Sequence, residues 1–384
     1  MFDFYFSVIS ILCCFFVSYL FFNSGFLSIP ESNNRFKSID GLRGFLAILV
    51  MLHHFVITYY WHFSGRWGDP TEIIYKNFGK VGVSMFFIIT GFLFISKIIK
   101  VDGKVNWIRL METRFFRIFP LYFLMVILIS LVVYLRGGFE FFNFHDVFSD
   151  YLLWLVFLGG DINSFSGTNL IIAGVDWTLR YEWFFYLLLP LISFLIYRVV
   201  GVFLLFFAFL IFLFFSPVVF GLNSKYFVLF YIGGGVAFLF HKFGDYISRL
   251  NFLNSKAFSL FLVLIIYLVL TNRNSMGVFQ MFLMGLLFFF IAAGSSIFGV
   301  LNSRYSILLG EISYSIYLLH GFVLYLFFGF FVNPESYTIF QYSLFMPVVA
   351  LIVVFLSVFS FKYIESPFVS LGHNGYFSRF LVGK

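Results

Sequence analysis

The feature that most constrains this chain is a succession of long apolar runs separated by short polar segments. About 20 apolar residues suffice for a helix to cross a bilayer. The runs do not alternate apolar with polar residues, as the strands of a membrane barrel would. The pattern predicts an all-α, polytopic transmembrane helical bundle of about 11 spans. We place the spans at 4–22, 42–62, 78–97, 117–135, 176–198, 200–220, 226–240, 257–271, 277–296, 305–331 and 341–362.

Composition supports lipid as the main solvent of this chain. Of the 384 residues, 62% are hydrophobic and only 11% are charged, whereas soluble domains carry about a quarter charged residues. The net charge of +7 comes from basic residues in short loops, as the positive-inside rule requires, so no nucleic-acid partner is expected. Cys13 and Cys14 are adjacent and have no metal-ligand spacing, and we predict no metal site.

Loop charge predicts the orientation of the spans. The segment 97–117 is the densest basic loop and should be cytoplasmic, like the loop 241–256 and the tail after Lys362. The apolar run 147–158 is too short to cross and is interpreted as re-entrant or interfacial. The N-terminus is then outside and the C-terminus cytoplasmic. The run 4–22 lacks a preceding Lys or Arg and a following cleavage site, so we interpret it as a retained span rather than a signal peptide.

The second span carries an unusual pair of ionisable residues. His54 follows Arg43 by eleven residues, which is about 20° past three full helical turns, so both side chains share one face. His54 lies about 16 Å deeper than Arg43, near the bilayer midplane. His53 points about 80° away from Arg43 and is the weaker candidate. The role of His54 could be purely structural, as one partner of an interhelical hydrogen bond. An ionisable residue at this depth is nevertheless a functional-site hypothesis by default. A neutral imidazole there is a plausible general base.

Two further segments bring charges to the same membrane region. Arg114 and Arg117 are three residues apart and therefore neighbours on one helix face. They could simply anchor the span in the cytoplasm, or they could form with Arg43 a cluster that binds phosphates.

Glu182 lies about 9 Å inside the outer edge of its span, at nearly the depth of His54. It could orient His54, serve as a base itself, or pair with Arg180. Trp177 and Trp183 are compatible with an interfacial belt or with stacking on a sugar.

For the other polar residues we predict mainly structural roles. Glu311 could cap or pair locally, and His320 could be interfacial. Glu365 lies at the cytoplasmic exit of the last span, where Pro367 is expected to end the helix. The three glycines at 233–235 predict close helix packing. The sequence contains no H-E-x-x-H, P-loop or G-x-S-x-G motif.

Taken in order, these segments resemble the acyltransferase 3 family of integral membrane acyltransferases. Arg43 and His54 in IDGLRGFLAILVMLHH match its arginine–ten residues–histidine signature, and RFFRIFPLY at 114–122 is similar to its paired-arginine segment. FFIITGFLF, WTLRYEWFFYLLLP, GEISYSIYLLH and ESP resemble its other motifs. The resemblance implies a membrane acyltransferase domain over residues 36–384. We expect two departures from the family: an extra transmembrane helix and loop over residues 1–35, and no soluble C-terminal domain of the kind that some relatives append.

The resemblance also implies a reaction in the cell inner (cytoplasmic) membrane. An acyl group, commonly acetyl, would pass from cytoplasmic acyl-CoA to a hydroxyl of an extracytoplasmic acceptor, often a sugar of a surface polysaccharide or O-antigen. Arg43, Arg114 and Arg117 would hold the CoA phosphates. His54 would activate the acceptor hydroxyl or transiently carry the acyl group, with Glu182 assisting.

The rival hypothesis is a transporter or a flippase of lipid-linked glycans, since many spans and intramembrane charges suit that class equally well. It predicts inverted internal repeats, which we do not find, and no dependence on acyl-CoA. A glycan polymerase is a weaker third hypothesis, because a larger outer loop would be expected.

Overall fold

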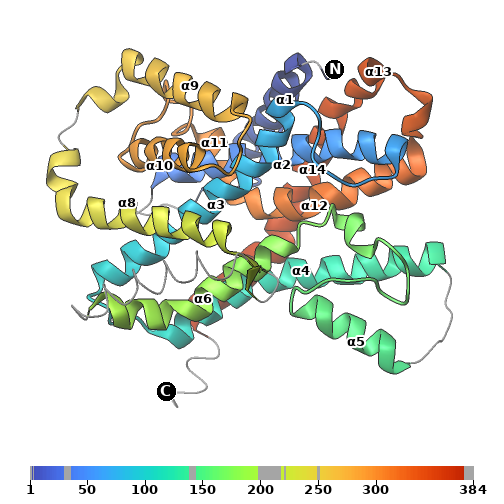
Figure 1. Ribbon diagram of the computed structural model, residues 1–384, viewed down its shortest axis with the longest axis horizontal. Helices are drawn as coiled ribbons and strands as arrows, with labels where there is room; N and C mark the ends of the chain where they lie inside the picture. Colours follow the sequence, from blue (N-terminus) through green and yellow to red (C-terminus); the bar gives the residue numbers. More distant parts are fainter. Residues whose placement is uncertain are drawn as a thin grey trace.

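The computed structural model describes residues 2, 4–29, 36–137, 144–197, 218–219, 222–248 and 251–375, and it is almost entirely helical (Figure 1). The α-helices are α1 (Phe4–Asn23), α2 (Lys37–Ser64), α3 (Ile73–Lys100), α4 (Trp107–Gly137), α5 (Phe144–Leu155), α6 (Trp177–Ile196), α8 (Ser224–Ser248), α9 (Lys256–Thr271), α10 (Val278–Ala292), α11 (Arg304–Glu311), α12 (Ser313–Leu326), α13 (Ile339–Ser343), α14 (Phe345–Ser360) and α15 (Ser366–Asn374). Short helical segments are η1 (Thr168–Ile172), η2 (Asn251–Asn254), η3 (Phe327–Phe331), η4 (Pro334–Ser336) and η5 (Phe361–Glu365). Strands β1 (Val218–Val219) and β2 (Leu222–Asn223) pair antiparallel.

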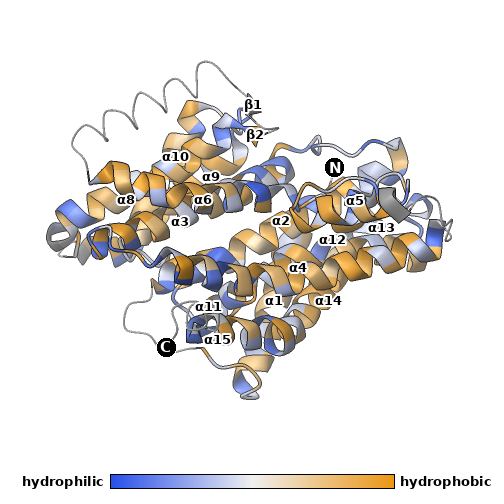
Figure 2. Cartoon of the chain, turned by 90° about the horizontal axis from the view of Figure 1, so that it is seen from below, coloured by the Kyte–Doolittle hydropathy of each residue, from blue (hydrophilic) through white to orange (hydrophobic). Residues whose placement is uncertain are grey.

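Within the described residues, eight helical segments are long and apolar enough to cross a membrane. They are Phe4–Asn23, Lys37–Ser64, Ile73–Lys100, Trp107–Gly137, Trp177–Ile196, Ser224–Gly244, Ser313–Phe331 and Ile339–Asn374, with α9 and α10 as shorter apolar helices. Each coincides with a predicted span, which confirms the polytopic helical bundle. Figure 2 shows that hydrophobic residues predominate along the long helices.

The remaining predictions about the spans have different outcomes. The predicted span 200–220 lies outside the described residues, apart from the two residues of β1. The short run 147–158 coincides with α5, a helix of 12 residues, which is too short to cross a bilayer. Its neighbour α4 contacts it through the Tyr122 hydroxyl, which donates to the carbonyl oxygen of Trp154 at 2.8 Å.

Two predicted helix boundaries are wrong. The predicted span 305–331 begins as two helices, because Ile312 leaves the helical region (φ −86°, ψ 7°) and separates α11 from α12. Pro367 does not end the last helix, since α14 passes through η5 into α15. Pro367 lies in the first turn of α15, where the N–H that proline lacks would have no helical partner.

Close glycine contacts hold α3 against α8. A Cβ atom at Gly233 would lie 2.0 Å from the carbonyl oxygen of Ile88, and one at Gly91 would lie 2.2 Å from that of Phe230. Only hydrogen atoms fit at these two crossings. The prediction of close packing is confirmed at Gly233, whereas a Cβ at Gly235 would meet no atom within 4 Å. In Figure 1, α3 runs through the middle of the molecule with α8 beside it.

Close glycine contacts also hold α2 against α11. A Cβ atom at Gly310 would lie 1.9 Å from the carbonyl oxygen of Asp40, and one at Gly41 would lie 2.0 Å from that of Leu301. These backbone contacts place the N-terminal turns of α2 next to the start of α12. The consequence for function is that Arg43 on α2 and Ser313 on α12 come together.

Candidate functional site

Two cavities lie among α2, α3, α6 and α12, and each contains one end of the Arg43–His54 face. The first, which we call the arginine cavity, has a volume of about 250 Å³, and the second, the histidine cavity, about 310 Å³. The arginine cavity is lined by polar side chains that include Arg43, Arg114, Arg117, Thr178, Glu182, Tyr186, Ser313 and Tyr314. The histidine cavity is lined by His53, His54, Trp67, Asp69, Lys80, Asn169, Trp177 and Tyr226, among others.

The structure brings the three predicted arginines together. Arg43 donates from Nη2 to Ser313 Oγ at 3.2 Å and forms an ion pair with Asp40, with 3.7 Å between Nη1 and Oδ1. The Arg114 guanidinium lies over the ring of Phe94, 5.2 Å from its centroid. Its Nε is buried without a hydrogen-bond partner. An unpartnered guanidinium donor in a cavity is suited to an anionic ligand.

Two carboxylates lie close to these arginines. Glu365 is 2% exposed, accepts a hydrogen bond from Ser315 Oγ, and interacts electrostatically with Arg117 and Arg43. Glu365 therefore lies beside the arginine cluster, whereas the sequence predicts a mainly structural role for it.

Glu182 lines the arginine cavity and not the histidine cavity. Its carboxylate accepts a hydrogen bond from the hydroxyl of Tyr186, one turn further along α6. Of the three roles considered for Glu182, this position beside the three arginines does not favour a contact with His54. A carboxylate there can balance guanidinium charge and position a ligand in the arginine cavity.

His54 is instead paired with His320 of α12. His54 Nδ1 lies 3.0 Å from both the carbonyl oxygen of Val50 and Nε2 of His320, and His320 Nδ1 lies 3.0 Å from the carbonyl oxygen of Ile316. A carbonyl only accepts, so each Nδ1 must carry the proton. The Nε2 of His320 is then an acceptor for the His54 Nδ1–H. The Nε2 of His54 keeps a lone pair, which is the requirement for a general base.

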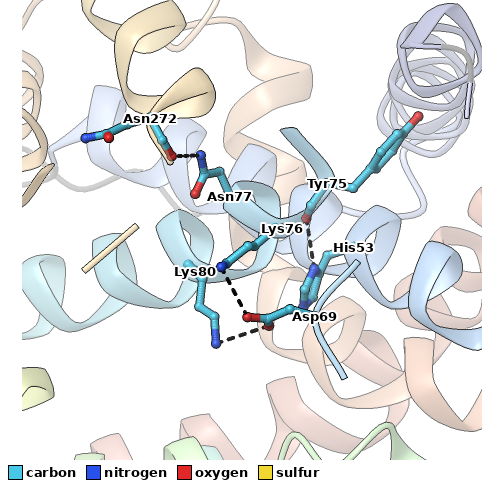
Figure 3. Close-up of polar contacts among 7 residues, drawn as sticks. All are labelled: His53, Asp69, Tyr75, Lys76, Asn77, Lys80 and Asn272. Atoms are coloured by element: carbon cyan, nitrogen blue, oxygen red, sulfur yellow. Dashed lines mark hydrogen bonds and ion pairs between the residues drawn. The ribbon is translucent and has the colours of Figure 1, made fainter. Parts of the chain in front are cut away.

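His53 has a different environment. Its Nδ1 donates to the carbonyl oxygen of Tyr75 at 2.8 Å (Figure 3). Its ring also packs so closely on Gly79 that a Cβ there would lie 2.3 Å from Cδ2. His53 lines the cavity, but its contacts are those of a helix-packing residue, in line with the prediction that it is the weaker candidate.

Charged side chains at the histidine cavity come from the α2–α3 loop and from α3. Asp69 forms ion pairs with Lys80 at 3.2 Å and with Lys76 at 3.7 Å, and these three side chains meet in Figure 3. Because the Asp69 side chain is 38% exposed, this network is accessible to a polar ligand and contributes little to stability.

Aromatic rings form another part of the same cavity. Trp67 stacks on His54, with ring centroids 6.1 Å apart and an angle of 20° between the planes. Trp177 packs against Tyr226 at 4.9 Å, and both rings line the cavity. The structure places Trp183 elsewhere, stacked on Phe157 at 6.1 Å. Aromatic faces beside charged and amide groups make a surface that suits a polyhydroxylated ligand.

Asp176 lies just before α6, outside the candidate span that begins at Trp177. It is 3% exposed, and burial raises the pKa of its carboxyl to about 6, although Arg180 acts in the opposite direction. No ion pair of Arg180 with Glu182 is found among the described residues; the Arg180 Nε is buried without a hydrogen-bond partner.

Sequence reasoning missed four residues that line the cavities and the role of His320. Trp67 and Asp69 lie in the polar loop between α2 and α3, Lys80 lies in α3, and none of them belongs to a recognisable motif. Tyr317 and His320 lie within the segment GEISYSIYLLH, and their spacing from Ser313 (four and seven residues) places all three on one helix face. That periodicity was the available signal. Among the described residues, no group of three or more His, Cys, Asp or Glu side chains is arranged to hold a metal ion.

Comparison with known proteins agrees with this geometry. Nodulation protein 10 of Rhizobium leguminosarum bv. viciae is 29% identical over 175 residues, which cover 43% of this chain and 46% of that protein. The match thus spans less than half of the relative's length. No solved structure matches. The model of the acyltransferase 3 family, described as an acyltransferase domain, matches residues 36–364. Since that region is most of the chain and includes both cavities, the chain belongs to the acyltransferase 3 family and is a polytopic membrane acyltransferase.

Proposed function

We propose that the protein is a membrane O-acyltransferase that moves an acyl group, acetyl in the simplest case, from acyl-CoA to a hydroxyl of a sugar acceptor. The observation that carries this proposal is the pair of adjoining cavities, one rich in arginine and the other containing a histidine with a lone pair on Nε2. The donor occupies the arginine cavity and the acceptor occupies the histidine cavity.

The arginine cavity suits the phosphates of CoA. Guanidinium groups bind phosphate oxygens in a bidentate manner, and Arg43, Arg114 and Arg117 all line this cavity. Glu182 and Glu365 partly balance their charge. Both carboxylates also accept hydrogen bonds from hydroxyl groups, Glu182 from Tyr186 and Glu365 from Ser315.

His54 acts as the general base. Its Nε2 takes the proton of the acceptor hydroxyl while that oxygen attacks the thioester carbonyl. The C–S bond then breaks, the new C–O bond makes the ester, and the thiolate of CoA leaves with the proton from His54. His320 Nε2 accepts from His54 Nδ1–H, which fixes the ring orientation and stabilises the transient imidazolium. Glu182 contributes to positioning the donor rather than to orienting His54.

The histidine cavity suits a sugar hydroxyl. Trp67, Trp177 and Tyr226 offer apolar faces, while Asp69, Lys80 and Asn169 offer hydrogen-bonding groups. The sugar class of the acceptor therefore rests on this lining. In this proposal α1 is an addition to a catalytic domain that starts near residue 36.

The proposal includes an orientation. The arginine cavity opens toward the cytoplasm of the inner membrane, where CoA is available, with the N-terminus outside and the C-terminus inside. The density of basic residues in segment 97–117, which runs from the end of α3 into α4, supports this assignment.

The test uses purified protein in proteoliposomes with radiolabelled acetyl-CoA and a panel of surface glycans. Wild type should release CoA and label a glycan. His54→Ala should lower this turnover by at least about 100-fold, the usual contribution of a general base. His62→Ala is the matched control, because His62 lies in the last turn of α2 and lines neither cavity. Full activity of His54→Ala would contradict the mechanism. Movement of a lipid-linked glycan without consumption of acyl-CoA would favour a transporter.

A further inference from the structure

The two cavities share a wall. Val83 of α3 and Tyr317 of α12 line both of them, and their side chains are only 9% and 8% exposed. The donor and acceptor sites of the proposed function are therefore adjacent but separated by one aromatic ring and one branched aliphatic side chain. An acyl group bound on the arginine side must pass this wall before it reaches His54.

Hydrogen bonds hold the ring of Tyr317 in place. Its hydroxyl lies 2.9 Å from Thr178 Oγ1 and 3.4 Å from the carbonyl oxygen of Val175, and Thr178 Oγ1 also lies 3.0 Å from that carbonyl. All three groups are buried, so the first turn of α6 and the residue shortly before it hold the phenol in place.

Ring contacts complete the closure. Tyr317 meets Phe86 edge to face at 6.1 Å and His320 edge to face at 6.0 Å. Its ring therefore touches the residue that pairs with His54. A movement of this ring changes the access to the base and the surroundings of the histidine pair together.

We propose that Tyr317 and Val83 form a gate between donor and acceptor sites, which keeps the water of the histidine cavity away from the thioester and limits the length of the acyl group transferred. This gate rests on the proposed function, since it assigns the two cavities to donor and acceptor. In the closed state shown here, water from the histidine cavity does not reach the thioester. The seated acyl group displaces the phenol from Thr178 and enters the space that the ring vacates, so the size of that space sets the acyl length.

The first test measures acyl selectivity and hydrolysis in proteoliposomes with acetyl-, butyryl- and hexanoyl-CoA. Tyr317→Ala should raise CoA release in the absence of acceptor by about tenfold and should accept the longer acyl groups. Val83→Ala should move both quantities in the same direction by less. Tyr317→Phe keeps the ring, so it should keep the preference for acetyl while hydrolysis rises.

The matched control is Tyr325→Ala, on the same helix. Tyr325 is also 8% exposed, lies under Arg136 at 5.0 Å, and lines neither cavity. If Tyr317→Ala and Tyr325→Ala leave acyl selectivity and hydrolysis equally unchanged while wild type transfers acetyl, the gate is refuted and the proposed function stands.

A second test does not require activity. Cys13 and Cys14 are replaced by Ser, and a single cysteine is introduced at Thr90, which lines the arginine cavity only. A charged, membrane-impermeant thiol reagent is added from the histidine-cavity side. The cysteine should be protected with Tyr317 present and should react at least about ten times faster in the Tyr317→Ala background.

Asn169→Cys provides the sidedness control, since Asn169 lines the histidine cavity and should react from that side in both backgrounds. Equal labelling of the Thr90 cysteine in both backgrounds would overturn the gate. Labelling does not depend on turnover. A protein that consumes no acyl-CoA would refute the proposed function, and the labelling would still show whether Tyr317 separates the two cavities.

Discussion

At the scale of single residues, the chemistry depends on which nitrogen of each histidine carries a proton. The two Nδ1 protons are fixed by backbone carbonyls within their own helices, at 3.0 Å in both cases. The pairing of His54 with His320 joins residues 266 positions apart. The proposed base is thereby oriented without a carboxylate, and the orientation comes from hydrogen bonds to backbone carbonyls and to His320.

His320→Ala should lower kcat by about 10- to 100-fold and leave KM for acetyl-CoA nearly unchanged. The variant removes the group that orients His54 but no group of the arginine cavity, and a general base contributes about 10²–10⁴-fold. Steady-state kinetics with varied acetyl-CoA provides the measurement. An increase in KM at constant kcat would show that His320 acts on donor binding instead.

Arg114→Lys should raise KM for acyl-CoA several-fold and leave kcat within about twofold. Lysine keeps the charge but loses the planar fork that binds two phosphate oxygens. The control is Arg109→Lys, because Arg109 is exposed, donates to the carbonyl oxygen of His373 and does not line the cavity. Isothermal titration with CoA separates binding from turnover, and equal affinity of wild type and Arg114→Lys would contradict the assignment.

At the scale of elements, glycine decides how closely the helices that carry the site approach one another. Backbone carbonyls lie where a Cβ would be at Gly91, Gly233 and Gly310. These contacts set how closely α3 approaches α8 and α2 approaches α11, and α2 and α3 carry residues of both cavities.

Gly233→Ala should destabilise the protein by about 1–3 kcal/mol, the usual cost of overpacking, because the new methyl group would meet backbone atoms of Ile88. Gly235→Ala is the matched control on the same helix. It meets open space and should be neutral or stabilising by up to about 1 kcal/mol, since alanine favours helix. Thermal unfolding in detergent compares the two, and equal Tm values would contradict the packing argument.

At the scale of the whole molecule, stability should depend on pH through Asp176. Its folded-state pKa is raised from 3.8 to about 6 by burial, so the folded protein binds the proton more tightly than the unfolded chain. This contribution is present below about pH 4, decreases as pH rises to about 6 and is absent above it. Two pKa units correspond to on the order of 3 kcal/mol.

The measurement is Tm in detergent between pH 4 and 8 for wild type and Asp176→Asn. The amide does not titrate, so the wild type should lose stability relative to the variant as pH rises from about 4 to about 6. Parallel curves would show that the Asp176 carboxyl is solvated in the folded protein. Arg180, one helical turn away, lowers the pKa and so reduces the size of the effect.

Much of the architecture could be predicted because spans are long, local and apolar. The face shared by Arg43 and His54 followed from one helical repeat, and both residues line the cavities. The cavity that Glu182 lines could not be predicted. The sequence of one helix gives the depth of a residue in the membrane, but not the direction in which that helix turns the residue toward its neighbours. The partner of His54 was missed for the same reason, and Asp69 because loop contacts have no periodicity.

The common wall of Val83 and Tyr317 has a consequence for the cell as a whole. A continuous wet path from one cavity to the other would also conduct protons and dissipate the electrochemical gradient that the membrane maintains. In the proposed mechanism, this wall lets the carbon skeleton of a short acyl group cross while the bulky nucleotide carrier and the ions remain on their own side. Such an enzyme would export a chemical group without also being an ion channel.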